Sequence, residues 1–106
     1  LLNPSLGTLY IILNADLVIG YICLTYSYSF EYGGKTAFID EFYLHPDQRS
    51  KGYGNQIMDK IIMIAKELKL ATLHLEAESH NDRANQLYFK KGFKNANRNL
   101  LYSRLN

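Results

Sequence analysis

The sequence has little of what several protein classes require. Its 106 residues include one cysteine, Cys23, which excludes an intrachain disulfide and the common cysteine-based zinc sites. We find no apolar run of membrane-spanning length and no secretory leader pattern. The formal charge of +2, from 12 basic and 10 acidic residues, is too small to indicate a nucleic-acid partner. These absences predict a soluble cytoplasmic protein with no metal, membrane or nucleic-acid site.

Apolar residues are abundant, in contrast. Hydrophobic residues make up 47% of the chain, and there are nine tyrosines but no tryptophan. Such a composition argues against a disordered chain. The length is that of one domain, so we expect a single domain over residues 1–106. Because the chain begins at Leu1 rather than methionine, we expect an N-terminus that is cut or incompletely represented.

One stretch, residues 38–69, organises the rest of the chain. It opens with apolar and aromatic residues typical of a strand. A turn follows at Pro46, whose ring fixes its own φ and moves His45 out of the helical region. Apolar residues then recur at helical spacing, at Ile57, Met58, Ile61, Ile62, Ala65 and Leu68. The pattern predicts a strand, a loop, and a helix that starts after Gly54 and ends near Lys69.

The loop between strand and helix, Arg49 to Gly54, has the features of an anion site. The start of a helix carries unpaired backbone N–H groups and the positive end of the helix dipole. Gly52 and Gly54 have no Cβ, so a ligand can approach the backbone closely. Arg49 and Lys51 add positive charge. We therefore predict that this loop binds a phosphate or pyrophosphate group.

Three nucleotide-binding patterns compete for this loop. The Walker loop requires Gly-Lys-Ser/Thr, whereas Gly54 is followed by Asn55 and Gln56. The dinucleotide fingerprint requires a glycine where Ile57 stands. The third pattern, Arg-x-x-Gly-x-Gly, is matched by Arg49 to Gly54 and resembles the coenzyme A loop of the GNAT superfamily of N-acetyltransferases. A helix that merely starts with two glycines is the alternative for the loop taken alone.

A second motif extends the resemblance. The pattern Asn-x-x-Ala-x-x-Leu-Tyr-x-x-x-Gly-Phe, from Asn81 to Phe93, is similar to the other signature of the same superfamily. Independently of any family, Asn81 is a good N-cap and Gly92 a good stop for a helix over residues 82–91. Because both motifs occur in the expected order, the chain is identified as a GNAT member, with a resemblance that covers residues 8–105.

The remaining elements predict an α/β (α+β) fold with a mixed sheet. An antiparallel meander is followed by β-α-β-α-β, and the strand-helix-strand connection makes the third and fourth strands parallel. The resemblance implies that these two strands then splay apart. Gly20 marks a bulge or a close backbone approach. The expected strands cover residues 8–13, 17–28, 36–44, 72–77 and part of 98–105.

The resemblance also implies a co-substrate, acetyl-CoA, in the slot between the splayed strands. The backbone at Tyr43 and Leu44 would meet the pantetheine arm and the thioester carbonyl, where an N–H can stabilise the oxyanion. Asn81 and Asn85 would bond the arm from the other side. The pyrophosphate would be held mainly by backbone N–H groups of Arg49, Ser50, Lys51, Gly52, Tyr53, Gly54 and Asn55.

Three residues are candidates for the chemistry. Attack on a thioester requires a neutral amine, so a base must remove a proton near neutral pH. Asp40 and Glu41 lie on the strand beside the slot and point to opposite faces unless a bulge intervenes. We favour Glu41 as the base, with Asp40 as the next candidate. Tyr88 matches the tyrosine that protonates the departing sulfur in many members. An ordinary core tyrosine, and an acid that pairs with Lys35, are the alternatives.

The sequence thus predicts an N-acetyltransferase for a small-molecule or peptide amine whose identity stays open. Residues 39–44 resemble the diamine acetyltransferase branch. An aromatic strand face of Tyr26, Tyr28 and Phe30 could add cation–π contacts to a cationic acceptor. A non-catalytic acyl-CoA-binding or regulatory module is the alternative function.

One departure from the family concerns the N-terminal side. A complete member has a further strand and two helices before the strand at Thr8, and those helices usually form one wall of the acceptor site. We expect them to be absent from residues 1–106. Sheet surface left uncovered favours association of chains. We therefore expect a homo-oligomer, in the simplest case a dimer.

Overall fold

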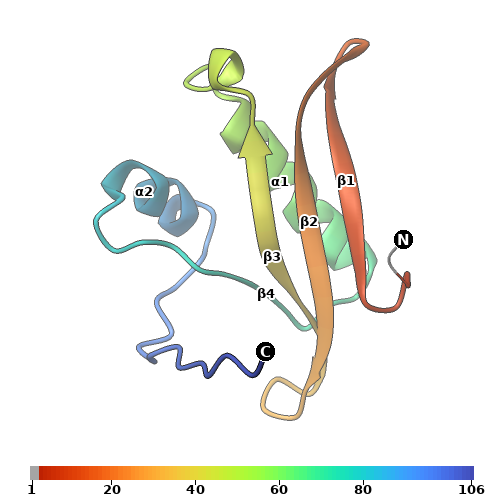
Figure 1. The fold of residues 1–106 in the computed structure, drawn as a ribbon, viewed down its shortest axis with the longest axis vertical. Helices are drawn as coiled ribbons and strands as arrows, with labels where there is room; N and C mark the ends of the chain where they lie inside the picture. The colour runs from red at the N-terminus through yellow and green to blue at the C-terminus, as the bar shows by residue number, and fades with distance from the viewer. Residues whose placement is uncertain (1–2) are drawn as a thin grey trace.

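A computed structural model describes residues 3–106 as one mixed sheet with two helices (Figure 1). The sheet order is β1-β2-β3-β4. Among the described residues, no helix is long and apolar enough to cross a membrane. The elements in chain order are β1 (Gly7–Asn14), β2 (Leu17–Ser29), β3 (Gly34–Leu44), the 3-10 helix η1 (Pro46–Gln48), α1 (Tyr53–Glu67), β4 (Thr72–Leu75) and α2 (Asp82–Lys90).

The first three strands form the predicted antiparallel meander. β2 is the inner strand, since it pairs with β1 on one side and with β3 on the other. Gly20 lies opposite Leu44, where a Cβ on Gly20 would stand 2.0 Å from the carbonyl oxygen of Tyr43. The predicted close backbone approach at Gly20 is confirmed, because only a residue without a Cβ lets the two strands come this near.

The parallel pair is confirmed and is short. β4 pairs with β3 at four positions, from Thr36 opposite Thr72 to Ile39 opposite Leu75. β3 continues to Leu44, and the chain after Leu75 turns away toward α2 (Figure 1). Within the described chain, no strand pairs with the β4-side edge of β3 beyond Ile39. The two strands therefore splay apart, as predicted.

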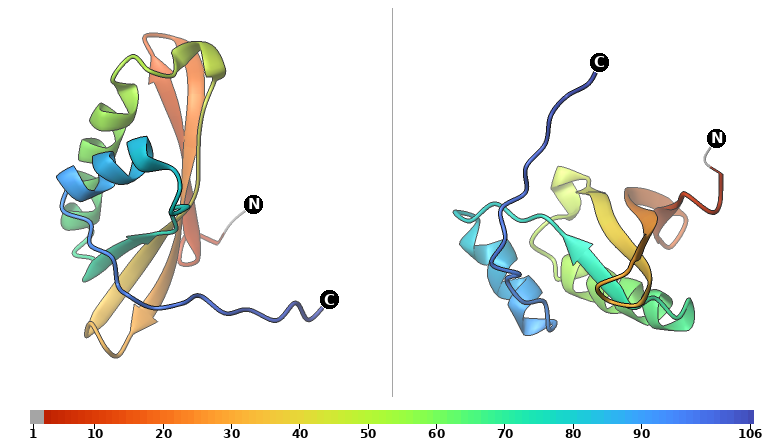
Figure 2. Two further views of the ribbon diagram at one scale, coloured as in Figure 1. Left: turned by 90° about the vertical axis from the view of Figure 1, so that its left-hand side faces the viewer. Right: turned by 90° about the horizontal axis from the view of Figure 1, so that it is seen from below.

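Both helices lie on the same side of the sheet (Figure 2). α1 buries Met58, Ile61 and Ala65, which recur at the predicted helical spacing. Ile61 packs with Ile22 and Leu24 of the inner strand, which are 1% and 0% exposed. This cluster, the centre of the core, holds α1 against the sheet.

α2 begins and ends as the sequence predicts. The Asn81 side chain accepts a hydrogen bond from the Ala84 N–H at 3.3 Å, which caps the helix. Gly92, with φ of 97°, provides the left-handed residue that follows the helix.

The final strand expected within residues 98–105 is wrong. These residues are irregular and run away from the sheet (Figure 2). Arg98 donates two hydrogen bonds, of 2.8 and 2.7 Å, to Glu31 in the β2–β3 turn. The ion pair holds this segment at the β2–β3 turn and away from β4. With four residues, β4 offers a short edge for a further strand to pair with. Leu100 and Leu105 are 66% and 95% exposed, so the apolar side chains of this segment do not pack against the sheet.

Candidate active site

The loop before α1 adopts a conformation suited to an anion. Ser50 and Gly52 both have positive φ, 62° and 82°, and Gly52 is the N-cap of α1. No side chain caps this helix start, so the first N–H groups of α1 are not occupied by a capping side chain. Left-handed residues within such a loop turn successive N–H groups toward one point. Lys51 and Asn55 are exposed beside it.

Arg83 of α2 reaches this loop, which the sequence analysis missed. Its Nη1 donates a hydrogen bond of 3.2 Å to Ser50 Oγ. The contact adds a positive charge to the loop from an element 33 residues away in the chain. The position falls inside the second motif but is unspecified in it, so only the packing of α2 reveals the role.

Arg49 points back to the end of β3. Its Nε donates to the carbonyl oxygen of Leu44 at 2.9 Å, and its guanidinium lies over the Tyr43 ring, 5.5 Å from the ring centre. Arg49 therefore joins the loop to the two residues whose backbone was predicted to meet the pantetheine arm. Its side chain braces the strand end.

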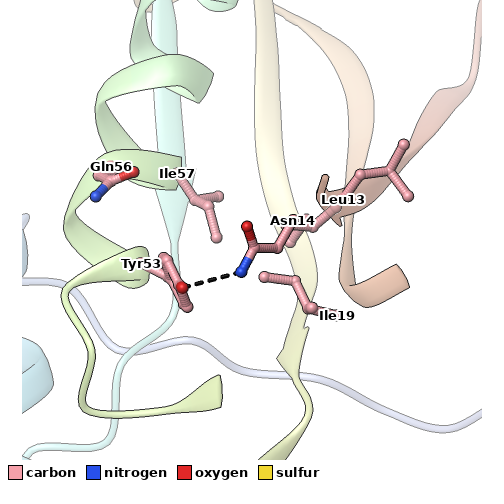
Figure 3. A pocket seen from close by; sticks show the side chains of 7 residues that line it. Leu13, Asn14, Ile19, Tyr53, Gln56 and Ile57 are labelled. Atoms are coloured by element: carbon pink, nitrogen blue, oxygen red, sulfur yellow. Dashed lines mark hydrogen bonds between the residues drawn. The ribbon is translucent and has the colours of Figure 1, made fainter. Parts of the chain in front are cut away.

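The Tyr53 side chain faces away from α2. Its hydroxyl accepts a hydrogen bond of 3.0 Å from Asn14 Nδ2, in a small pocket between β1, β2 and the start of α1 (Figure 3). Only the Tyr53 backbone N–H is then available for the predicted pyrophosphate contact. The pocket is lined by Ile12, Leu13, Asn14, Ile19, Tyr53, Gln56 and Ile57.

Asn81 and Asn85 use their side chains locally. Asn81 caps α2, and Asn85 Nδ2 donates to the carbonyl oxygen of Glu78 at 3.0 Å. These bonds shape the turn between β4 and α2. Both residues lie at the start of α2, and their contact with the cofactor stays a prediction.

Tyr88 is half-buried on α2. Its ring meets Phe93 edge-on, with ring centres 6.0 Å apart. Burial raises the pKa of the Tyr88 phenol, because the charged form loses water. A neighbouring α2 residue, Leu87, has its Cδ2 3.8 Å from the position of a Cβ on Gly54. α2 thus packs against the start of α1 through Leu87, and Tyr88 is the residue of α2 that follows Leu87.

Asp40 and Glu41 sit at a β-bulge. The register places Cys23 opposite Glu41 and Leu24 opposite Ile39, which leaves Asp40 as the extra residue. The pKa of the Cys23 thiol is raised by burial and then by the charges of Asp40 and Glu41. Both acids are therefore near the same cysteine and both are exposed. The bulge relaxes the strict alternation that would separate them.

Tyr21 is the second residue that the sequence analysis missed. Its hydroxyl donates a hydrogen bond of 2.5 Å to Glu41 Oε1, and its ring stacks on Tyr43, with ring centres 5.6 Å apart. The bond to Glu41 is the largest cause of a raised pKa of the Tyr21 phenol. A Tyr21–Glu41 pair cannot be seen in the sequence without the register of β2 against β3.

The aromatic face predicted for the acceptor lies elsewhere. Tyr28 pairs with Lys35 at the far end of the β2–β3 hairpin, seven positions along β2 from Tyr21, or about 23 Å. Lys35 lies over the Tyr26 ring at 4.4 Å, and Tyr26 packs against the core. The ring that contacts Glu41 is instead Tyr21, which stacks on Tyr43.

Comparison with known proteins gives the family and fold that this chain resembles. A family model described as Acetyltransferase (GNAT) family matches residues 1–93. A Bos taurus protein named thialysine N-epsilon-acetyltransferase is 31% identical over 71 residues, which are 67% of this chain and 41% of that protein. This chain therefore spans less than half of that relative.

Solved structures share the fold. An integron cassette protein from the mobile metagenome of Cole Harbour Salt Marsh has a TM-score of 0.83 and 31% identity, over 98% of this chain and 63% of that one. A possible acetyltransferase from Clostridium difficile 630 has a TM-score of 0.82 and 21% identity, over 98% and 69% of the two chains. At 21% identity, the similarity to the Clostridium difficile protein supports the fold alone.

Proposed function

Because this chain belongs to the GNAT acetyltransferase family, we propose that it transfers an acetyl group from acetyl-CoA to a primary amine. The observation that carries the proposal is the loop with left-handed Ser50 and Gly52 at the uncapped start of α1. This loop stands at the end of β3, beside the splayed strands and next to α2. A pyrophosphate in the loop would let the pantetheine arm run along the free edge of β3.

The cofactor contacts are divided between backbone and side chains. Backbone N–H groups of residues 49–55 bind the pyrophosphate, and Lys51 and Arg83 supply positive charge. The β3 edge at Tyr43 and Leu44 receives the arm as an added strand, and an N–H there polarises the thioester carbonyl. Asn81 and Asn85, at the start of α2, border the arm.

The chemistry is direct attack in a ternary complex. The acceptor ammonium loses a proton to Glu41 or Asp40, directly or through water, and the neutral nitrogen attacks the thioester carbon. As the C–S bond breaks, Tyr88 donates its phenolic proton to the departing thiolate. The attacking nitrogen releases its second proton to solvent, from which Tyr88 regains a proton. The Tyr88 phenol, whose pKa burial raises above the ordinary value of about 10, is protonated at neutral pH and can donate.

The acceptor is a cationic primary amine. Two exposed carboxylates near Cys23 attract a positive charge, and the stacked Tyr21 and Tyr43 rings add a surface for an alkylammonium group. The bovine relative's name supplies a concrete first probe, thialysine. We propose that this amine, or a short diamine, is acetylated.

Acetyl-CoA binding tests the cofactor site. Calorimetry of the full chain is expected to detect binding, and Gly54→Glu is expected to weaken it at least tenfold by charge repulsion at the loop. Met63→Glu is the matched control, since Met63 is 54% exposed on the same helix, about 13 Å along its axis from Gly54. It should bind acetyl-CoA as the parent does.

Other outcomes discriminate between functions. Equal loss in both variants would mean that charge on α1, and not the loop, governs binding. Binding without turnover of any amine would favour the non-catalytic acyl-CoA-binding module. No binding by a folded parent chain, as judged by far-UV circular dichroism, would contradict the cofactor site.

We also propose that two copies of the chain associate. β1 forms one edge of the sheet, and its Leu9, Ile11 and Leu13 are 53%, 54% and 58% exposed. An apolar edge strand of this length favours pairing with another chain. Light scattering is expected to give the mass of a dimer, and Ile11→Lys that of a monomer. Met63→Lys, on the helical side, should remain dimeric, and a monomeric parent would contradict the proposal.

A further inference from the structure

We propose that Tyr21 is a positioning residue for the acceptor amine, which acts by holding the Glu41 carboxylate toward the incoming nitrogen. The inference rests on the proposed function and adds a residue that no motif of the sequence contains. It is carried by the hydrogen bond of 2.5 Å from Tyr21 Oη to Glu41 Oε1 and by the stacking of Tyr21 on Tyr43.

The first step concerns the face of the sheet. Ile22 and Phe42 pair across β2 and β3 and pack in the core cluster under α1. Tyr21 and Tyr43, the adjacent pair, therefore point to the opposite face, because side chains alternate along a strand. The Tyr21–Glu41 bond shows that Glu41 also lies on that face. The pair thus faces away from both helices.

The second step concerns order. An exposed glutamate has several rotamers, and holding it in one orientation costs conformational entropy. Tyr21 is well suited to hold it, because its ring stacks on the Tyr43 ring. Tyr43 is in turn covered by the Arg49 guanidinium, which is bonded to Leu44. A continuous set of contacts therefore joins Glu41 to the end of the cofactor loop.

The third step concerns the free oxygen. A carboxylate has two oxygens and about four acceptor positions. Tyr21 occupies one position on Oε1, which leaves Oε2 to accept an N–H of the acceptor. The arrangement holds an amine within reach of the β3 edge, where the thioester carbonyl is proposed to lie. Tyr21 thus acts through Glu41 without touching the reacting atoms.

Removal of the hydroxyl tests the role. Tyr21→Phe keeps the ring and its stacking but loses the bond, so kcat/KM for thialysine is expected to fall about tenfold with KM for acetyl-CoA unchanged. Tyr28→Phe is the matched control, since Tyr28 is a 64% exposed tyrosine of the same strand. It should behave as the parent. An equal rise of both KM values in Tyr21→Phe would indicate a merely structural role and overturn the proposal.

A double-mutant cycle identifies the partner. If Tyr21 acts through Glu41, the Tyr21→Phe/Glu41→Gln double variant should be no slower than Glu41→Gln alone. Multiplicative losses, with each substitution lowering the rate by its full factor, would show that the two side chains act independently and would overturn the inference.

A measurement without turnover keeps this test separate from the proposed function. Carbon-13 NMR of labelled tyrosine rings, assigned with Tyr21→Phe, is expected to show the Tyr21 phenol titrating above its ordinary pKa because of Glu41, with smaller effects of Tyr43 and Cys23. Glu41→Gln should lower that pKa. An ordinary Tyr21 titration in the parent would overturn the positioning role even if acetyl transfer is found. A raised one in a chain that acetylates no amine would contradict the proposed function alone.

Discussion

Gly20→Ala is expected to lower the free energy of unfolding by about 3 kcal/mol, at the upper end of the cost of overpacking. A Cβ at this position would stand 2.0 Å from the carbonyl oxygen of Tyr43 and 3.0 Å from Leu44 Cα. Both are backbone atoms, so no side-chain rotamer can relieve the clash. β2 is held on both sides by β1 and β3, and the strands must separate locally.

Urea denaturation measures this effect, with Gly54→Ala as the control. Gly54 has ordinary helical surroundings, and its new Cβ would stand 3.8 Å from Leu87. Alanine is the better helix former by roughly 1 kcal/mol, so the same substitution should leave stability unchanged or raise it. Opposite signs for two Gly→Ala changes would identify the close approach as the cause. A Gly20→Ala chain as stable as the parent would contradict it.

The same variant should also lose activity beyond its loss of stability. The backbone of Tyr43 and Leu44 is the proposed contact for the pantetheine arm, and it is the part that must move. Acetyl-CoA affinity of folded Gly20→Ala, measured well below its melting temperature, is therefore expected to fall.

Tyr88→Phe is expected to lower kcat for thialysine about 100-fold, the lower bound for loss of a general acid. The ring and its contact with Phe93 remain, so KM for acetyl-CoA should change little. Steady-state kinetics measure the split. Tyr102→Phe is the matched control, because Tyr102 is 88% exposed in the C-terminal segment. A Tyr88→Phe chain that retains half of the parent's kcat would contradict the assignment.

The raised pKa of Tyr88 predicts how kcat changes at alkaline pH. Burial raises the pKa of Tyr88, so the phenol stays protonated above its ordinary value of about 10 and loses its proton only as pH rises through the raised value. The parent's kcat should therefore hold on the alkaline side up to about pH 10 and fall beyond it. In Tyr88→Phe that alkaline limb should be absent.

Local sequence patterns determined most of the fold. The strand, turn and helix over residues 38–69 were predictable because Pro46, the glycines and the helical recurrence of apolar residues act over a few positions each. The same holds for α2, whose cap at Asn81 and stop at Gly92 are local hydrogen-bond and φ requirements.

Two other predictions depended on long-range contacts: the parallel pairing of β3 with β4 was confirmed, and the strand within residues 98–105 was wrong. The parallel order of β3 and β4 followed from the strand-helix-strand connection, because a single helix returns the chain to start the next strand in the same direction. The strand within residues 98–105 did not form, because a strand needs a partner edge and an ion pair from Arg98 to Glu31 took the segment elsewhere. Strand propensity depends on the segment's own residues and carries no information about the competing ion pair with Glu31.

The sequence by itself determined β1 to β4, α1 and α2, and that a glycine-containing loop precedes α1. Only the tertiary structure decided which side chains meet. The bulge opposite Cys23 set the relation of Asp40 to Glu41, and the register of β2 on β3 brought Tyr21 to Glu41. Likewise, packing of α2 brought Arg83 to Ser50. The physical reason is that a one-residue change of register moves every side chain to the other face, so the site depends on a pairing that no local pattern specifies.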